Sequence, residues 1–507
     1  MLPTGEPTNR SFAGEQSGSR AGIRHRRHAP SPHTVAAEEY RMSADAPLPF
    51  QDDPRVAQAI ALLDQVVADA GRDLNDVRAA DPTKVDAYRA RLEEFARLRA
   101  GALYYPYLAT GRGHGPYVEL ADGSVKLDFI NGIGVHGFGH AHRAMRHCGI
   151  RAAICDTVMQ GNLQQADASV DLCRRLVELA RRSGAAIEHV AISTSGAMSN
   201  ENALKLAFHA RPGRNRLLAF ERCFAGRTLV LSQLTDKAAF RVNLPTDVPI
   251  DYLPFCDASD VAGSTERTLA AMRRHVGRYP NRHAAIWFEL VQGEGGYNVG
   301  ERSYLHAICA EARKLGIPIV FDEVQTFGRT TRPFAFQHFG LDEYAELVTV
   351  GKITQACATL FSAAFAPGPG LISQTFTAGT WELLAAIEVL DRMAAGNLFG
   401  PEGSNARLHA RFAAGLERIA ERTSGAIRGP WGIGGMIALT PLEGRADQAK
   451  RLAELCFDEG LMGFVAGAEP TRLRFLPPLL AIDDAMIDRA LELLERAVGR
   501  LVAEFPR

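Results

Sequence analysis

The chain carries the stretch Ile317-Pro318-Ile319-Val320-Phe321-Asp322, an apolar run that ends in a carboxylic acid. Two further runs have the same form, because 284–288 leads to Glu289 and 347–351 leads to Lys352. Nearly continuous apolar runs that are separated by helical patterns are typical of parallel strands buried on both faces. We therefore predict an α/β fold with a mainly parallel sheet that is covered by helices.

The periodicity of apolar residues extends this prediction along the chain. A further strand is predicted over 189–194, and helices are predicted over 200–211 and 304–315. After the sheet, long amphipathic helices are predicted at 406–422, 446–459 and 484–502, with short strands between them. This C-terminal pattern predicts a second, smaller α+β domain.

The N-terminal region has a different composition. Residues 1–50 are rich in Gly, Ser, Pro, Arg and His, so we expect a disordered tail. Helical spacing follows, and 117–129 is predicted to form a hairpin around Asp122-Gly123. The predicted organisation is a tail (1–50), a helical extension with the first part of the small domain (51–150), a large domain (151–385) and the rest of the small domain (386–507).

Composition narrows the class of partner and the compartment. The 57 Lys+Arg and 58 Asp+Glu give a formal charge of −1, which argues against nucleic acid or a membrane surface and favours a small molecule. Eight scattered cysteines without a CxxC pair argue against a disulfide framework and indicate a reducing compartment. With no run of 18 apolar residues and no signal-like segment, we expect a cytoplasmic protein.

The candidate site lies where the three apolar runs end. Ligands of an open parallel sheet bind beyond the carboxyl ends of its strands, so Glu289, Asp322 and Lys352 are predicted to converge there. Each residue alone has an ordinary explanation, since an acid after a strand can cap a helix and a lone lysine usually lies on the surface. A lysine that is buried beside an aspartate needs a functional reason, and covalent Schiff-base chemistry supplies one.

A second cluster of small residues precedes the helix predicted from Asn200. Ser195, Gly196 and Ala197 would free backbone N–H groups at the positive end of that helix, which suits a phosphate, although in isolation an ordinary N-cap is the better explanation. The turn has neither a Walker lysine nor a GxGxxG pattern. A phosphate cradle, an aspartate and a Schiff-base lysine together describe a site for pyridoxal 5′-phosphate.

Several ordered motifs lead to a family. The sequence resembles the class III aminotransferases, the fold type I pyridoxal-phosphate enzymes of the ornithine, acetylornithine and 4-aminobutyrate aminotransferase group. The resemblance covers residues 100–500 and implies a large cofactor-binding domain and a smaller α+β domain. Its motifs lie at 127–142, 195–205, 224–228, 289–296, 322–330, 351–352, 375–376 and 474–479.

The resemblance implies a role for each cofactor-binding residue. Lys352 would carry the cofactor as a Schiff base and move a proton between the substrate carbon and the cofactor, and Asp322 would pair with the pyridinium nitrogen. Gln325 would contact the phenolic oxygen and Phe224 would stack on the ring. The remaining predicted cofactor contacts are Ser195, Gly196 and Ala197 at the phosphate, Glu289 beside the ring, and Thr375 on the phosphate of a neighbouring subunit, which implies a homodimer.

The resemblance also implies three substrate-binding residues. Arg474 would bind a substrate α-carboxylate, Glu294 would mask that arginine when the substrate presents an amine, and Arg227 would hold a second carboxylate; the planar fork of arginine suits this work. The chain departs from the family at Ala225, where a histidine or tryptophan is usual, and after Lys352, where a glycine-rich run is missing. These departures leave the cofactor residues in place and put the substrate preference in doubt.

The predicted function is transfer of an amino group to a 2-oxo acid, 2-oxoglutarate first among them, with a donor such as ornithine, acetylornithine, lysine or 4-aminobutyrate. A decarboxylase, racemase or aminomutase of the same fold is the first alternative, because the same lysine and aspartate serve all of these reactions. A remote alternative is a metal hydrolase that uses the histidines 136, 140, 142 and 147. A catalytically silent relative that only binds is a further alternative, and the retained lysine and aspartate argue against it.

Overall fold

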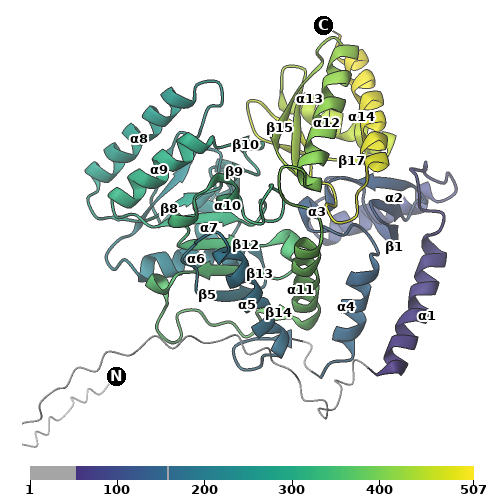
Figure 1. The fold of residues 1–507 in the computed structure, drawn as a ribbon. Coiled ribbons are helices and arrows are strands. Elements are labelled where there is room, and N and C mark those ends of the chain that lie inside the picture. The colour runs from purple at the N-terminus through teal and green to yellow at the C-terminus, as the bar shows by residue number, and fades with distance from the viewer. Residues whose placement is uncertain (1–52, 157–158, 507) are drawn as a thin grey trace, which may run out of the picture. The chain divides into compact units, whose positions relative to one another are not determined.

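The three apolar runs form neighbouring strands of a seven-stranded sheet (Figure 1). The computed structural model describes residues 53–156 and 159–506, so the tail predicted over 1–50 lies outside the described residues. The strand order is β5-β13-β12-β11-β8-β6-β7. The bounds are β5 (His189–Ser193), β6 (Arg216–Phe220), β7 (Ile250–Leu253), β8 (His283–Phe288), β11 (Ile319–Glu323), β12 (Leu347–Val350) and β13 (Cys357–Phe361).

The register of this sheet aligns the ends of the central strands. Strand β11 pairs in parallel with β8 on one side and with β12 on the other, and Asp322 lies opposite Thr349. Strand β13, which the sequence analysis did not predict, runs antiparallel to both β12 and β5. A connection of only six residues after β12 explains this direction, because a parallel return needs a crossover of a dozen residues or more.

Helices cover both faces of the sheet, as predicted. Side chains of β6 alternate between two apolar clusters, since Leu217 and Ala219 belong to one and Leu218 and Phe220 to the other. Helices α6 (Gly196–His209) and α7 (Leu229–Leu234) contribute to the first cluster, and the second receives α5 (Asp167–Arg181), α8 (Val261–Arg278), α9 (Arg302–Lys314) and α10 (Ala335–Phe339).

The C-terminal region adds a four-stranded antiparallel sheet in the order β15-β16-β19-β18. The three long amphipathic helices predicted there are present, and α13 has the predicted bounds. The elements are α12 (Ser404–Arg422), β15 (Ile427–Ile433), β16 (Met436–Pro441), α13 (Ala446–Glu459), β18 (Phe464–Ala466), β19 (Arg472–Phe475) and α14 (Asp484–Glu504).

The N-terminal region joins the C-terminal one through a shared sheet. The predicted hairpin is present as β2 (Tyr117–Leu120) and β3 (Val125–Asp128), which pair antiparallel. Strand β17 (Leu461–Met462) pairs in parallel with β3 and so extends this sheet from the other end of the chain. Helices α1 (Pro54–Gly71) and α2 (Val85–Leu98) precede the hairpin and its partner β1 (Ala109–His114).

The remaining elements are short or connect these regions. The predicted boundary between 385 and 386 falls inside α11, so the division into domains stays a prediction. These elements are α3 (Asn131–Gly134), α4 (Arg143–Ala153), β4 (Met159–Gln160), η2 (Ala238–Phe240), β9 (Val291–Gln292), β10 (Asn298–Val299), η3 (Asp342–Tyr344), η4 (Lys352–Thr354), η5 (Ala363–Phe365), β14 (Ala378–Gly379) and α11 (Thr380–Ala395).

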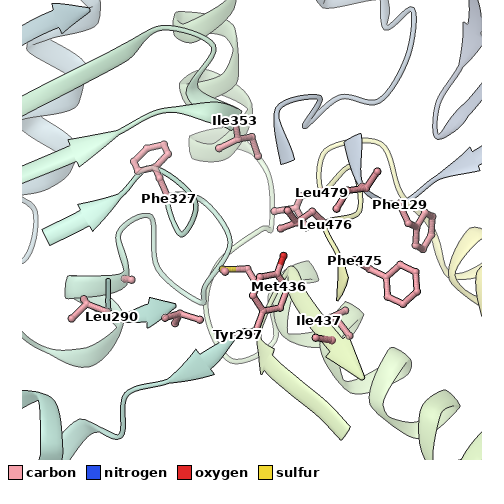
Figure 2. Packing of buried hydrophobic residues seen from close by; sticks show 14 of the residues in the cluster. Phe129, Leu290, Tyr297, Phe327, Ile353, Met436, Ile437, Phe475, Leu476 and Leu479 are labelled. Atoms are coloured by element: carbon pink, nitrogen blue, oxygen red, sulfur yellow. The ribbon is translucent and has the colours of Figure 1, made fainter. Parts of the chain in front are cut away.

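Side chains from three distant parts of the chain meet in one apolar core, a part of which Figure 2 shows at close range. Phe129 comes from the N-terminal part, Tyr297 and Phe327 come from the large sheet's loops, and Phe475 and Leu476 come from the C-terminal sheet. Each of these side chains is at most 1% exposed. The apolar contacts therefore hold the loops of the large sheet against strand β19.

The structure also bears on the predictions about cysteines and about membrane-spanning segments. All eight cysteines are free thiols, so the expectation of no disulfide framework is confirmed. Among the described helices, none is both long and apolar enough to cross a membrane.

Phe321 in β11 provides a test of the central core. It is fully buried, stacks on Phe336 at 6.2 Å between ring centroids and contacts Phe288. We expect Phe321→Ala to lower the free energy of unfolding by about 3–5 kcal/mol, because it leaves a cavity between the sheet and α10. Urea denaturation followed by circular dichroism measures this loss. Leu98→Ala, at a side chain that is 79% exposed, is the control and should change stability by less than about 0.5 kcal/mol; equal effects of the two variants would contradict the assignment.

Candidate active site

A cavity of about 310 Å³ lies at the carboxyl ends of β8, β11 and β12. Most of the side chains that the sequence analysis singled out line it, so residues up to 156 positions apart are brought together. The predicted residues on its wall are Gly196, Ala197, Phe224, Arg227, Glu289, Glu294, Asp322, Gln325 and Lys352, and those that are not on its wall are Ser195, Thr375 and Arg474.

Asp322 is the most completely hydrogen-bonded group of the cavity. Its carboxylate accepts hydrogen bonds from the Val324 N–H at 3.0 Å and from Asn200 Nδ2 at 2.9 Å, with a longer contact from Thr349 Oγ1 at 3.5 Å. Burial raises the pKa of Asp322, and the hydrogen bond from Val324 and the positive charge of Lys352 oppose that rise. A carboxylate held in this way is prepared for a cationic partner in the cavity, because such a partner would stabilise its charged form.

Glu289 holds the wall next to Asp322. Its two oxygens accept hydrogen bonds from the backbone N–H groups of Phe224 at 2.8 Å and of Gly293 at 3.0 Å. Burial, and after it the negative charge of Asp322, raise the pKa of Glu289. Glu289 thus ties the loop that carries Phe224 to the segment that follows β8.

Lys352 enters the cavity from the end of β12. Its backbone φ is +54°, in the left-handed region that residues with a Cβ rarely adopt. Its ammonium forms neither a hydrogen bond nor an ion pair with any residue of the described chain. Burial lowers the pKa of Lys352 to about 8, although Asp322 opposes the shift. A lysine in this state has a substantial neutral fraction near physiological pH, and the neutral amine is the nucleophile.

The N-terminus of α6 forms the anion-binding end of the cavity. The side chain of Ser195 caps the helix by accepting a hydrogen bond from the Met198 N–H at 3.2 Å, while Gly196 and Ala197 line the cavity. A Cβ added to Gly196 would lie 2.7 Å from Val324 Cγ1, so this position needs a glycine. First-turn N–H groups at a helix N-terminus suit a phosphate.

Phe224 and Gln325 lie on opposite segments of the wall. Phe224 is partly exposed to the cavity and meets Phe240 edge to face, with 6.4 Å between the ring centroids. The buried amide oxygen of Gln325 has no hydrogen-bond partner within the described chain. A polar ligand would satisfy this atom, so the site fits a planar, polar, phosphorylated group with a cationic nitrogen, as predicted for pyridoxal phosphate.

Arg474 and Glu294 form an ion pair at the side of the cavity that faces the C-terminal sheet. Arg474 is fully buried, donates from Nη1 to the Gly293 carbonyl at 3.1 Å and pairs through Nη2 with Glu294. Burial works to raise the pKa of Glu294, but Arg474 outweighs it and holds that pKa below its usual value. Arg474 therefore lies behind Glu294 rather than on the cavity wall.

Arg227 stands at the solvent side of the cavity. Its guanidinium lies 3.5 Å from the centroid of the Phe240 ring, and Lys237 lies over the same ring at 4.6 Å. Thr375 is exposed and is not among the cavity-lining residues of its own chain. Its predicted contact with a neighbouring subunit stays a prediction.

Asn200 is the site residue that sequence reasoning missed. Its side chain binds Asp322 and also donates to the Ala225 carbonyl at 2.6 Å, so it links β11, α6 and the loop that carries Phe224. The only signal in the sequence was its position, one helical turn after the small residues 195–197. An asparagine there has no chemical signature of its own, because its role depends on a partner 122 residues away.

Three of the four histidines of the metal-hydrolase alternative have separate hydrogen-bond partners. His140 pairs with Asp128 at 3.0 Å, His142 accepts the Ala144 N–H as the cap of α4, and His147 pairs with Asp64. No group of three or more metal-ligating side chains occurs in residues 53–156 and 159–506. The geometry does not favour the metal hydrolase.

Comparison with known proteins agrees with this geometry. A family model described as "Aminotransferase class-III" matches residues 101–498. The chain is 31% identical over 414 residues to acetylornithine aminotransferase from Gloeobacter violaceus, which covers 77% of this chain and 93% of that protein. Its fold is similar to that of lysine aminotransferase from M. tuberculosis, with a TM-score of 0.72, 22% identity, and coverage of 81% and 99%. It is also similar to ornithine aminotransferase from Toxoplasma gondii, with a TM-score of 0.70, 22% identity, and coverage of 84% and 100%.

Glu323, directly after Asp322, provides a test of the buried charges. It accepts hydrogen bonds from the N–H groups of Ala335 and Phe336, and burial raises its pKa to about 7. The folded chain therefore binds the proton of the Glu323 carboxyl more tightly than the unfolded chain does. The contribution of Glu323 to the free energy of unfolding consequently declines as pH rises from about 4.5 to about 7. Glu323→Gln should make the decline less steep, as measured by urea unfolding across this range.

Glu311→Gln is the matched control for that measurement. Arg273 lowers the pKa of Glu311, so Glu311 contributes stability above its unfolded pKa, and this variant should make the decline steeper. A Glu323→Gln protein with the pH profile of the wild type would show that Glu323 is not titrating in the fold.

Proposed function

This chain belongs to the class III aminotransferase family, and on that premise we propose that it transfers the terminal amino group of a diamino or ω-amino acid to 2-oxoglutarate. The observation that carries the donor class is the ion pair between Arg474 and Glu294 next to the cavity. The name of the similar Gloeobacter protein, acetylornithine aminotransferase, supports a donor of this kind. Acetylornithine, ornithine and lysine are the first donors to test.

Pyridoxal 5′-phosphate is the cofactor of the reaction, and when bound it withdraws electrons from the substrate carbon that loses a proton. Lys352 would hold it covalently, Asp322 would pair with its ring nitrogen, and the first turn of α6 would bind its phosphate. Phe224 and Gln325 would contact its ring and phenolic oxygen. The orphaned amide oxygen of Gln325 and the lack of any ion-pair partner for Lys352 among the described residues support this assignment.

Lys352 has a second task in this proposal. Its Nζ would take the proton from the substrate carbon that bears the amino group and return a proton in the second half of the reaction. A pKa lowered to about 8 favours this role, because general acid–base catalysis is most efficient when the pKa lies near the working pH. The neighbouring cation Arg474 also acts to lower the pKa.

The three charged side chains would sort the two substrates. With Glu294 on Arg474, the buried cation is neutralised, so a donor can present an uncharged or cationic chain end near Lys352 and place its carboxylate at Arg227. For 2-oxoglutarate, Glu294 would leave Arg474 and the free guanidinium would bind the carboxylate next to the oxo group. The movement of the Glu294 carboxylate would thus set the difference in affinity between the amino donor and 2-oxoglutarate.

We further propose that the working unit is a homodimer. Thr375 would then reach the phosphate site of the partner, and its exposed position outside its own cavity supports this. Analytical ultracentrifugation gives the mass in solution. A monomer with full activity would overturn the shared-site part of the proposal.

Glu294→Gln tests the sorting of substrates. Because glutamine cannot neutralise Arg474, we expect the kcat/KM for acetylornithine, relative to that for L-glutamate, to fall by about tenfold or more. Coupled assays of glutamate formation and consumption measure the two values. Glu417→Gln, an exposed position on α12, is the control and should leave the ratio unchanged. An unchanged ratio in Glu294→Gln would remove Glu294 from substrate selection.

Lys352→Ala tests the covalent attachment. We expect loss of transamination by at least about 10³-fold, together with loss of the near-ultraviolet absorbance that a borohydride-reduced, covalently bound cofactor leaves on the denatured chain. Lys237→Ala, which removes a lysine outside the cavity wall, should retain the bound absorbance. Retention of covalent cofactor in Lys352→Ala would contradict the assignment, and failure of every donor with the covalent cofactor intact would contradict only the substrate class.

A further inference from the structure

A second cavity, of about 630 Å³, lies between the loops of the large sheet and the C-terminal sheet. None of the residues that line the active-site cavity lines this one. Its wall comes from the ends of β6 and β7, from residues 292–301, and from β15 and β19. We call it the β19 cavity, because strand β19 supplies the side chain that is hardest to explain without a ligand.

That side chain is Arg472, which is only 8% exposed. Its guanidinium donates to the Gly296 carbonyl and to Asn298 Oδ1 at 3.1 Å, and it lies 4.3 Å from the ring centroid of Trp431. Its buried Nε has no hydrogen-bond partner, and no carboxylate of the described residues pairs with it. Burial, and after it the positive charge of Arg222, lower the pKa of Arg472 to about 10. A buried cation without a counter-charge is costly in a protein interior.

The other two buried arginines of the described chain do not share this condition. Arg474, two residues further along β19, has the carboxylate of Glu294. Arg329 lacks a carboxylate, but it donates to two backbone carbonyls and is tightly enclosed, since a Cβ added to Gly134 would lie 2.8 Å from its Nη2. Arg472 itself lines a cavity of ligand size, so an external anion can reach it.

Four more charged side chains on the same wall form no ion pair with any described residue. Arg222 is exposed, and it has a φ of +64°, a conformation in which a residue with a Cβ is strained. Glu221, Asp257 and Glu301 are also exposed and line the cavity. The two cations Arg222 and Arg472 and these three carboxylates thus face one cavity without pairing with one another.

We propose that the β19 cavity binds a small amino acid as a zwitterion, with its carboxylate on Arg472 and its ammonium toward Glu221 or Glu301. The guanidinium fork supplies the geometry for a carboxylate, and the ring of Trp431 fixes the orientation of that fork. The two glutamates disfavour a phosphate, which would meet like charges on the rim. The volume lies in the range of small-molecule sites.

This site would be connected to the active site through one short segment. Gly293 and Glu294 bind Arg474, whereas Gly296 and Asn298 bind Arg472, so residues 293–298 contact both arginines. An amino acid bound at Arg472 would hold this segment from its far side. The proposal concerns binding at the β19 cavity and does not depend on the donor proposed above.

The test uses equilibrium dialysis of the holoenzyme with radiolabelled L-glutamine, which carries one carboxylate, one ammonium and a neutral side chain. We expect saturable binding to the wild type, and binding weaker by about tenfold or more to Arg472→Met. Arg267→Gln is the matched control, because Arg267 lines the same cavity but pairs with Asp260 at 2.9 Å, and it should bind like the wild type. Arg474→Ala, which alters the active site, should retain this binding and so separates the two sites.

Competition experiments identify the chemical class. Glutaramate, which has the skeleton of glutamine without the α-amino group, should displace the label only at about tenfold higher concentration, and the double variant Glu221→Gln, Glu301→Gln should weaken binding by a similar factor. Equal displacement by inorganic phosphate or by glutaramate would overturn the zwitterion in favour of a simple anion. Absence of saturable binding, or equal binding by Arg472→Met, would overturn the site itself.

The melting temperature (Tm) of each variant shows whether a loss of binding is due to misfolding. Arg472→Met removes an unpaired buried charge, so we expect it to keep the Tm of the wild type or exceed it. L-Glutamine should raise the Tm of the wild type and not that of Arg472→Met. If Arg472→Met has a much lower Tm than the wild type, Arg472→Lys replaces it in the binding experiment. Binding of L-glutamine to Arg472→Lys with the affinity of the wild type would then overturn the role of the guanidinium fork.

Discussion

The burial of ionisable groups at the ends of three adjacent strands is the constraint on which the rest of this molecule depends. Glu289, Asp322 and Lys352 lie side by side because β8, β11 and β12 pair in parallel with their ends in register. Bringing charges out of water costs free energy, which the surroundings must offset with hydrogen bonds and opposite charges. The N–H groups of Phe224, Gly293 and Val324 do this for the carboxylates. The loops around the cavity are therefore held by the same bonds that make the cavity polar.

The same constraint explains why the C-terminal sheet is needed for chemistry that begins on the large sheet. Arg474 lies behind Glu294, next to the cavity, because β19 packs against the loop after β8 through the apolar contacts of Tyr297 and Phe475 with their neighbours (Figure 2). Its partner Glu294 belongs to that loop. A substrate carboxylate that displaces Glu294 would change the contact between the two sheets, so substrate selection and the packing of these parts are physically linked.

Strand β19 places two arginines on the same face, two residues apart, because side chains of a strand alternate with a period of two. Arg474 lies behind Glu294 at the cavity that Lys352 lines, and Arg472 borders the β19 cavity. They differ in their counter-charge: one has a glutamate from the protein, and the other has only carbonyl and amide oxygens and an indole ring. The protein thus neutralises the charge of Arg474, whereas in our proposal a bound ligand neutralises the charge of Arg472.

Much of the fold could be predicted because its signals are local. The apolar runs, the hairpin around Asp122-Gly123 and the amphipathic helices each follow from a periodicity of a few residues. The structure has each of them, although α6 begins at Gly196, four residues before the predicted start at Asn200. Residue types also indicated the chemistry, because a lysine buried beside an aspartate needs a functional reason. The strands β6, β7 and β13 of the large sheet and the short strands β4, β9, β10 and β14 escaped prediction, because each forms only by pairing with another segment.

The sequence by itself determined the main helices and strands and the side chains that meet in the cavity, since these depend on short-range patterns and on residue type. The tertiary structure alone decided which polar groups satisfy one another. It gave Asp322 its partner Asn200, set Arg474 behind Glu294 and left Arg472 without a counter-charge. The physical reason is that the electrostatic state of a buried group depends on distance and burial, and these appear only when segments more than a hundred residues apart come together.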